Sequence, residues 1–143
     1  MFLGRFEHVL DSKSRLTVPV KYRPALSSGM VVTKGPGDFL VLFPTAEWER
    51  LVARSRELPT LTDENVAELR RWLFAEAAEI DMDSQGRIIL PLELREHAGI
   101  VTAVTLAGVD THIELWAPTY WQERPAHRMQ DNELTDSFRS LRL

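Results

Sequence analysis

Apolar and polar residues alternate in short runs along this chain, and glycine, proline, aspartate or serine bounds each run. A period of two residues in short runs rich in branched and aromatic side chains is typical of β-strands. One polar turn lies between Phe6–Leu10 and Arg15–Val18, and another lies between Ile80–Met82 and Arg87–Leu90. We therefore expect two local hairpins. The pattern predicts strands over Phe6–Leu10, Arg15–Val18, Met30–Lys34, Phe39–Phe43, Ile80–Met82, Arg87–Leu90, Val101–Ala107 and His112–Trp116.

Helical spacing follows a different pattern and occurs between and after these strands. Leu92–Ala98 lies between a proline and a glycine, which favour the start and the end of a helix respectively. Thr45–Glu57 and Asp63–Glu79 predict a pair of helices between the two groups of strands. A short helix after Pro19 contains Pro24, whose ring clashes with the preceding turn, so we expect this helix to be short or kinked.

One block of sequence occurs twice, with residues 11–23 returning as residues 83–95. Aspartate, serine, proline and both arginines coincide without a gap, and three further positions are apolar in both copies. Two copies indicate a duplicated half with a pseudo-two-fold relation, since repeat arrays need three or more units. Ser14 stands where the second copy has Gly86, which tolerates positive φ, so we expect the two turns to differ.

The length of 143 residues fits one compact α+β domain. We divide it into a first repeat (1–50), connecting helices (51–78), a second repeat (79–124) and a C-terminal tail (125–143). The tail is polar and mixed in charge, and two interpretations stay open for it. It is either an amphipathic helix or a segment that is disordered until a neighbour packs on it.

Composition narrows the classes of function. The chain has no cysteine, which excludes disulfides, thiolate metal sites and a thiol nucleophile. No apolar run reaches the ~20 residues of a membrane span or forms a signal peptide, so we expect a cytoplasmic protein without a membrane partner. The net charge of the chain is −4, but the charge is unevenly distributed. Residues 1–24 carry five basic and two acidic side chains, whereas residues 81–99 carry two basic and four acidic side chains. The first copy therefore provides the more basic face.

Each copy opens with an Asp-x-x-x-Arg turn, at residues 11–15 and 83–87. One interpretation is an ion pair that closes a hairpin. The other is that the aspartate fixes the turn while the arginine, with Lys13 or Gln85 beside it, is presented to DNA. The planar guanidinium matches guanine or phosphate through two hydrogen bonds, and a two-stranded ribbon is narrow enough for the major groove.

Several motifs together resemble the MraZ family, bacterial regulators encoded at the head of the division and cell-wall gene cluster. These are the Met-Phe-x-Gly opening, Asp-Ser-Lys-x-Arg-Leu-x-Val-Pro at 11–19, Tyr22-Arg23, and Asp-x-x-Gly-Arg-Ile-x-x-Pro at 83–91. The likeness runs from Met1 to about Trp121. It implies two tandem AbrB-like swapped-hairpin β-barrel half-units with pseudo-two-fold symmetry and intervening helices. It also implies a ring-shaped homo-oligomer, associated with the nucleoid, that binds direct repeats in the promoter of its own gene cluster.

The resemblance also implies roles for residues at matching positions. Asp11 and Asp83 are expected to position the turns, because a carboxylate facing phosphate would repel it. Arg23 and Arg95 are expected to pair with neighbouring acids on the short helices. The DNA contacts expected at the matching positions are Lys13, Arg15, Gln85 and Arg87. Arg5, outside the repeated block, is expected to contact a phosphate, with a merely solvated side chain as the alternative.

A ring would compensate for the weak positive charge of one subunit, because several faces on repeated boxes gain from effective concentration. Boxes near one helical turn apart, about 10 base pairs, would place successive faces on the same side of the duplex. Candidate ring contacts are Trp72, Phe74 and Trp121, for which a place in the core is the alternative.

Two rival functions are weighed against DNA binding. Glu79, Asp81 and Asp83 alternate along a predicted strand, as the carboxylates of a Mg²⁺ enzyme could. However, no phosphate loop or nucleophile elbow accompanies them, so we expect no catalysis, cofactor or small-molecule substrate. The second rival is a ring that scaffolds other proteins.

A metal site is not expected either. The four histidines show no metal-ligand spacing: His8, His97, His112 and His127.

Overall fold

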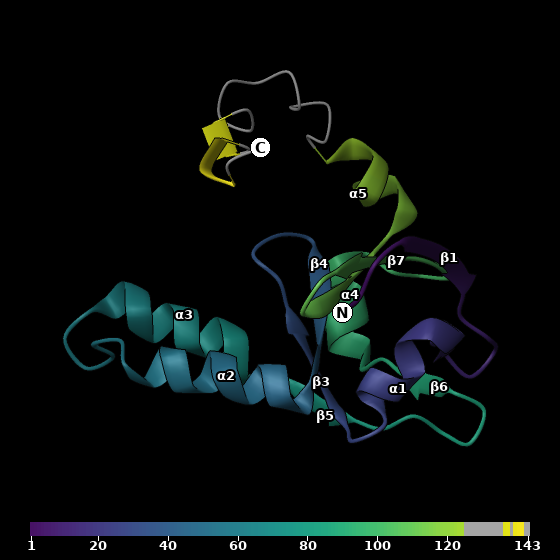
Figure 1. Ribbon diagram of the computed structural model, residues 1–143, viewed down its shortest axis with the longest axis horizontal. Helices are drawn as coiled ribbons and strands as arrows, with labels where there is room; N and C mark the ends of the chain where they lie inside the picture. The colour runs from purple at the N-terminus through teal and green to yellow at the C-terminus, as the bar shows by residue number, and fades with distance from the viewer. Residues whose placement is uncertain (125–135, 138, 142–143) are drawn as a thin grey trace.

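Figure 1 presents the computed structural model of the chain, which describes residues 1–124, 136–137 and 139–141. The predicted mixed α+β class is confirmed. The strands are β1 (Arg5–Val9), β2 (Arg15–Thr17), β3 (Met30–Lys34), β4 (Phe39–Pro44), β5 (Ala78–Ile80), β6 (Arg87–Ile89), β7 (Ala103–Val109) and β8 (His112–Trp116). The helices are a 3₁₀ turn η1 (Val20–Tyr22), α1 (Arg23–Leu26), α2 (Thr45–Arg56), α3 (Glu64–Phe74), α4 (Leu92–Ala98) and α5 (Pro118–Glu123).

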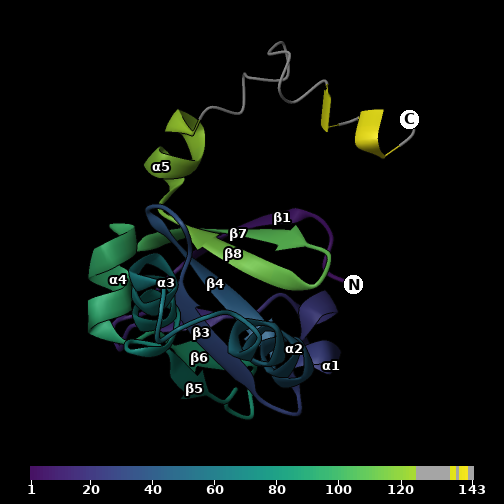
Figure 2. The same ribbon diagram turned by 90° about the vertical axis from the view of Figure 1, so that its left-hand side faces the viewer.

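Six strands form one antiparallel sheet in the order β1-β7-β8-β4-β3-β5. The order is symmetric about its centre. Exchanging β1 with β5, β3 with β7 and β4 with β8 gives the same order read from the opposite edge. The central pair, β4 with β8, joins the halves, and Leu40 lies opposite Leu115 there. The sheet is open at β1 and β5, so the prediction of two β-barrel half-units is wrong as to closure (Figure 2).

The remaining two strands, β2 and β6, form a separate antiparallel ribbon. Leu16 lies opposite Ile88, and both are buried. The prediction of two local hairpins is therefore wrong: β1 pairs with β7 and β2 with β6, each across the halves. A lone hairpin is marginally stable in water, whereas pairing across the halves buries one face of both ribbon strands in the common core.

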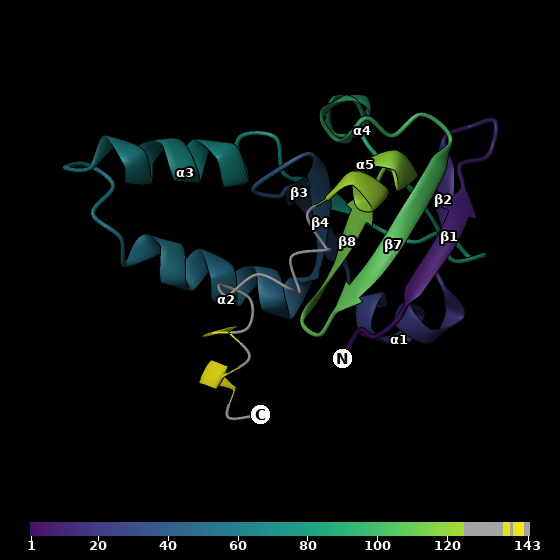
Figure 3. The same cartoon turned by 90° about the horizontal axis from the view of Figure 1, so that it is seen from above.

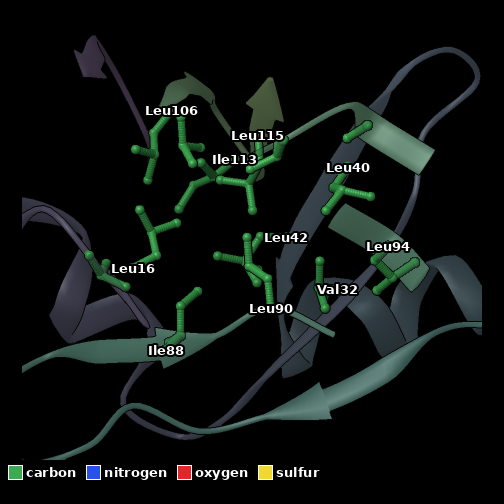
Figure 4. Close-up of a cluster of buried hydrophobic side chains, with 14 of the residues drawn as sticks. Leu16, Val32, Leu40, Leu42, Ile88, Leu90, Leu94, Leu106, Ile113 and Leu115 are labelled. Carbon is green, nitrogen blue, oxygen red and sulfur yellow. The ribbon is translucent and has the colours of Figure 1, made fainter. Parts of the chain in front are cut away.

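The core is a single cluster drawn from both copies of the repeat (Figure 4). Matching positions supply matching contacts, since Leu16 and Ile88, and Val18 and Leu90, are all buried within it. Tyr22 takes the place of Leu94 in the first copy, and its hydroxyl donates to the Leu3 carbonyl oxygen at 2.6 Å. The core therefore requires both halves.

Prolines and glycines set the ends of the short helices as predicted. Pro91 is the N-cap of α4, and Gly99 ends that helix in the left-handed conformation with φ of 66°. Pro24 divides the matching segment of the first copy into η1 and α1, where it occupies the first turn of α1. A proline in the first turn costs no helical hydrogen bond.

Helices α2 and α3 form a hairpin that projects from the side of the sheet (Figures 1 and 3). The Asp63 carboxylate caps α3 by accepting from the Asn65 N–H at 2.9 Å. Helix α3 ends at Phe74, so its predicted extension to Glu79 is wrong. Residues Ala78–Ile80 instead form β5, which pairs with β3 and completes that edge of the sheet. The predicted C-terminal tail lies mostly outside the described residues.

Candidate nucleic-acid interface

The first Asp-x-x-x-Arg turn is held by the carboxylate of Asp11. One of its oxygens, Oδ1, accepts from the backbone N–H groups of Lys13 and Arg15, both at 2.9 Å. The other, Oδ2, accepts from Nε of Arg15 at 2.6 Å. The Asp11 N–H in turn donates to the Arg15 carbonyl oxygen at 3.0 Å. Asp11 therefore fixes both the backbone of the turn and the direction of its arginine.

The second turn repeats this network atom for atom. Oδ1 of Asp83 accepts from the N–H groups of Gln85 and Arg87 at 2.8 and 2.9 Å. Oδ2 accepts from Nε of Arg87 at 2.8 Å. The prediction that the two turns differ is wrong, because Ser14 adopts the same left-handed conformation as Gly86, with φ of 60° against 76°. For a residue with a Cβ that conformation costs about 1–2 kcal/mol, which the carboxylate network of the turn offsets.

The two carboxylates are acidic groups held in their charged form. The backbone N–H of Arg15 is the main cause that lowers the pKa of Asp11 below its usual value, and the side chain of Arg15 and the N–H of Lys13 lower it further. The pKa of Asp83 is lowered in the same way, mainly by the N–H of Arg87. Partial desolvation opposes these shifts and is outweighed. Both turns thus keep an anion bound to their arginine at neutral pH.

Each arginine keeps hydrogen-bonding capacity for a ligand. The aspartate binds only Nε, and within the described residues the Nη groups of Arg15 and Arg87 donate to no other side chain or carbonyl. Their side chains are 27% and 24% exposed. A guanidinium whose Nε is fixed presents its two Nη groups in a defined direction, which suits a base edge or a phosphate.

Both arginines point to the same side of the ribbon. Leu16 and Ile88 face the core, and successive side chains of a strand alternate between its faces, so Arg15 and Arg87 face outward. Arg15 lies opposite Ile89, two residues beyond Arg87, which puts the two arginine Cα atoms roughly 7 Å apart on the diagonal. Both line one hollow of about 290 Å³. The structure therefore brings together the arginines of two turns that are far apart in sequence.

Lys13 and Gln85 occupy equivalent places at the exposed tips of the turns. The loop that follows β1 and the loop that precedes β6 both lie at the end of the molecule away from the α2–α3 hairpin (Figures 1 and 3). The tips are therefore open to a large ligand. They differ in charge, since only the first carries a cation beyond its arginine.

Arg5 is not part of this arrangement. It lies at the other end of β1 from the first turn, and a five-residue strand spans about 17 Å. Its guanidinium pairs with Glu7 at 3.5 Å and lies 5.8 Å from the centre of the Trp121 ring. Arg124 stacks on that ring at 3.3 Å, and burial is the main cause that lowers its pKa, with the nearby charge of Arg5 adding to it.

Arg23 and Arg95 have partners other than those predicted. Nε of Arg23 donates to the Val18 carbonyl oxygen at 2.9 Å, and Nε of Arg95 donates to the Leu90 carbonyl oxygen at 3.0 Å. The expected pairing with acids on the short helices is therefore wrong. These arginines satisfy the carbonyl that a strand leaves unpaired before a proline, and their identical offset in the two copies was the available signal.

Two outward-facing residues escaped the sequence prediction. Thr17 and Ile89 share the exposed face of the ribbon with the arginines, each two positions along its strand. The two-residue period of a strand is the signal that places them there.

Two further kinds of feature are absent among the described residues, clusters of metal-ligating side chains and helices that could span a membrane. Between residues 1 and 124 and in the short described stretches beyond, no three His, Cys, Asp or Glu side chains gather as metal ligands would. His127 lies outside these ranges. Among the same residues, no helix is long and apolar enough to cross a lipid bilayer.

Comparison with known proteins gives a consistent result over most of the chain. Residues 1–71 and 73–139 match the family described as "MraZ protein, putative antitoxin-like". A protein of Herpetosiphon aurantiacus named transcriptional regulator MraZ is 43% identical over 122 residues, which are 85% of each chain. Proteins of the same name from Syntrophomonas wolfei and Pediococcus pentosaceus are each 42% identical over 123 residues, 86% of this chain and 85% of theirs. A match of this extent, over both copies of the turn, shows that the chain belongs to the MraZ family.

Proposed function

We propose that this chain is a non-enzymatic transcriptional regulator that binds direct repeats in the promoter of its own division and cell-wall gene cluster. The observation that carries the proposal is the pair of arginines on one outward face, each oriented by the aspartate of its own turn. The names of the relatives agree with a regulator of transcription.

The chemistry of the face suits double-stranded DNA. A guanidinium can donate two hydrogen bonds to O6 and N7 of guanine in the major groove, and a two-stranded ribbon fits into that groove. In the proposed complex Arg15 and Arg87 contact bases, while Lys13 and Gln85 at the tips contact the backbone beside them. Arg5, set apart from the turns, would contact a more distant phosphate. Asp11 and Asp83 position the turns and do not touch DNA.

We further infer that each half is an AbrB-like unit of the swapped-hairpin kind. Two observations support this: β2 and β6 pair across the halves, and the order of the sheet is unchanged when the halves are exchanged. In this scheme residues 1–50 and 79–124 are the two units, residues 51–78 connect them, and residues 125–143 are a tail. A protein of this kind would act in the cytoplasm, on the nucleoid.

The proposed assembly is a homo-oligomeric ring. The α2–α3 hairpin supports it, because no apolar residue of either helix is fully buried within the described chain. Leu61 at the hairpin tip is 99% exposed, and Leu69 faces solvent as well. Of the candidate ring contacts, Trp72 donates to the Gly35 carbonyl oxygen, Phe74 packs on Trp48, and Trp121 packs on Trp116, so all three already have partners in their own chain.

Fluorescence anisotropy with the upstream promoter fragment and a shuffled fragment tests the proposal. We expect tighter binding to the promoter and a steep decrease of affinity with salt, from several phosphate contacts. Arg15→Gln should weaken promoter binding by about 1–3 kcal/mol, the value of a bidentate base contact. The matched control is Arg54→Gln on α2, which removes the same charge far from the turns; because α2 belongs to the hairpin proposed for the ring, the control is used with its oligomer shown unchanged by gel filtration.

The same samples separate the rival functions. Gel filtration should show the oligomer unchanged in Arg15→Gln. A scaffold would instead lose assembly in this variant and bind neither fragment at low salt. Equal affinity for the two fragments would indicate a general DNA coat and contradict the proposed regulator. Cleavage of either fragment when Mg²⁺ is added would contradict the non-enzymatic part of the proposal.

A further inference from the structure

The outward face of the ribbon carries two cross-strand pairs of the same chemical type. Arg15 lies opposite Ile89, and Arg87 lies opposite Thr17. Each pair thus combines a guanidinium with a β-branched side chain that carries at least one terminal methyl group. Side chains directly opposite in an antiparallel pair have Cβ atoms about 5 Å apart, close enough to contact neighbouring bases.

Ile89 is exposed although its neighbours on the strand are buried. Its side chain is 59% exposed, while Ile88 and Leu90 are packed in the core. It lines the hollow of about 290 Å³ together with Ile80 and Met82, so part of the lining of this hollow is apolar. A hollow lined by apolar side chains and by two guanidinium groups is suited to a ligand with a methyl group beside hydrogen-bond acceptors.

The charges around the hollow disfavour a phosphate there. Asp81 and Asp83 line it as well as the two arginines, and Asp11 lies beside Arg15. Three carboxylates against two guanidiniums leave no net positive charge to hold a phosphate dianion or diester. A base edge, which is neutral, carries no such penalty.

Resting on the proposed function, we infer that Ile89 and Thr17 contact the 5-methyl groups of thymines in the major groove. Each thymine neighbours a guanine that is bound by the arginine opposite, Arg15 for Ile89 and Arg87 for Thr17. Thymine is the base that presents a methyl group in this groove, and isoleucine and threonine methyls are suitable contacts for it. The second copy of the repeat therefore reads bases directly and does not only support the first.

The two contacts are unequal. Ile89 offers a larger apolar surface than Thr17. The hydroxyl group of Thr17 forms hydrogen bonds with water, so less of this side chain is apolar. Loss of the thymine contacted by Ile89 should therefore weaken binding more than loss of the thymine contacted by Thr17.

A scan of the promoter fragment with deoxyuridine tests this inference. Each thymine of one box is replaced in turn by deoxyuridine, which lacks only the 5-methyl group. We expect the wild-type protein to bind about fourfold more weakly at one position, the factor that corresponds to burial of one methyl group. A second position should show a smaller loss.

Two variants assign these positions. Ile89→Ala should bind the unmodified fragment more weakly and lose its sensitivity at the first position only. Thr17→Ser removes one methyl group and keeps the hydroxyl, and it should lose its sensitivity at the second position only. Ile89→Thr, which preserves strand preference, serves as a second variant should Ile89→Ala fold poorly; it keeps one methyl group, so it should reduce the loss at the first position to that seen at the second.

The outcomes distinguish this inference from the function on which it rests. If the wild type prefers the promoter but no deoxyuridine weakens binding, the methyl contacts are refuted and the regulator remains. If Ile89→Ala keeps the full sensitivity of the wild type, Ile89 is not the contact and the inference is also refuted. If the wild type does not distinguish the promoter from the shuffled fragment, the proposed function itself fails.

Discussion

The two turns have the same shape but carry different charges. Their aspartates accept from the same two backbone N–H groups and the same arginine nitrogen, at distances that agree within 0.2 Å. Their tips, in contrast, carry Lys13 in one copy and Gln85 in the other. The carboxylate network therefore sets the geometry, while the tip residues vary without affecting it. The difference between Lys13 and Gln85 at the tips therefore concerns the ligand and not the fold of the turns.

The comparison also shows how one conformation can be held at unequal cost. Gly86 accepts a positive φ without strain, whereas Ser14 adopts it against its preference. Gly86 has a second role, because a Cβ at this position would overlap the guanidinium of Arg23. The second turn therefore depends on its glycine more than the first turn would.

Substitution of Ser14 and Gly86, the residues with positive φ, should give the largest difference between the turns, measured as a change in the free energy of unfolding. Gly86→Ala should lower the free energy of unfolding by about 2–3 kcal/mol, from the left-handed backbone and from displacement of Arg23 from the Val18 carbonyl. Ser14→Gly should raise it by about 0.5 kcal/mol, since relief of strain exceeds the entropy cost of glycine. Urea unfolding measures both.

Ser14→Ala is the control for this pair, because it keeps a Cβ in the same conformation and should leave the stability nearly unchanged. A Gly86→Ala protein as stable as the wild type would mean that Arg23 and the turn relax freely. The claim that the second turn depends on its glycine would then be wrong.

Exchange of the tip residues should give a smaller effect, on DNA binding alone. Lys13→Gln should reduce the slope of log affinity against log salt by about 0.9 for each subunit on the DNA, because one phosphate contact is lost. Gln85→Lys should increase the slope by the same amount if the second tip lies equally close to the backbone. The double variant should then regain the wild-type slope. An unchanged slope in Gln85→Lys would place the second tip away from phosphate.

The smallest difference between the turns is expected in the dependence of stability on pH, because both aspartates make the same contacts. A carboxylate whose pKa is lowered on folding stabilises the protein above the unfolded pKa, and this stabilisation is lost as the pH falls through the folded pKa. Asp11→Asn and Asp83→Asn should therefore be less stable than the wild type at neutral pH, and this difference should shrink below pH ~4. Urea midpoints at a series of pH values measure it. A difference that persists in acid for one variant would show that the two turns are not equivalent.

Much of the local structure is predictable from the sequence, because local chemistry determines it. Gly99 ends α4, Pro24 divides the helix of the first copy, and the repeated aspartates open the two turns as expected. Each of these features depends on residues within one or two turns of the chain. The spacing of apolar residues also places most of the strands.

Strand pairing is not predictable in the same way. Alternation along β2 identifies its buried face but not its partner, and Leu16 finds Ile88 only because both copies fold onto one core. The same tertiary pairing with β3 converts the predicted end of a helix into β5. For the candidate site, the arginines and aspartates of the turns were predictable. Their convergence on one face was not, and neither was the exposure of Ile89.

The pairing of β2 with β6 has a consequence for how the chain folds. Residues 15–17 find their partner strand only in residues 87–89, so the ribbon closes a loop of about seventy residues. During synthesis at ~5–20 residues per second, the first strand waits several seconds before its partner leaves the ribosome. Contacts of such long range slow folding. Until the second half is made, strands β1 and β2 of the nascent chain lack their partner strands. This is therefore the stage at which the chain exposes the most unpaired strand edges to chaperones.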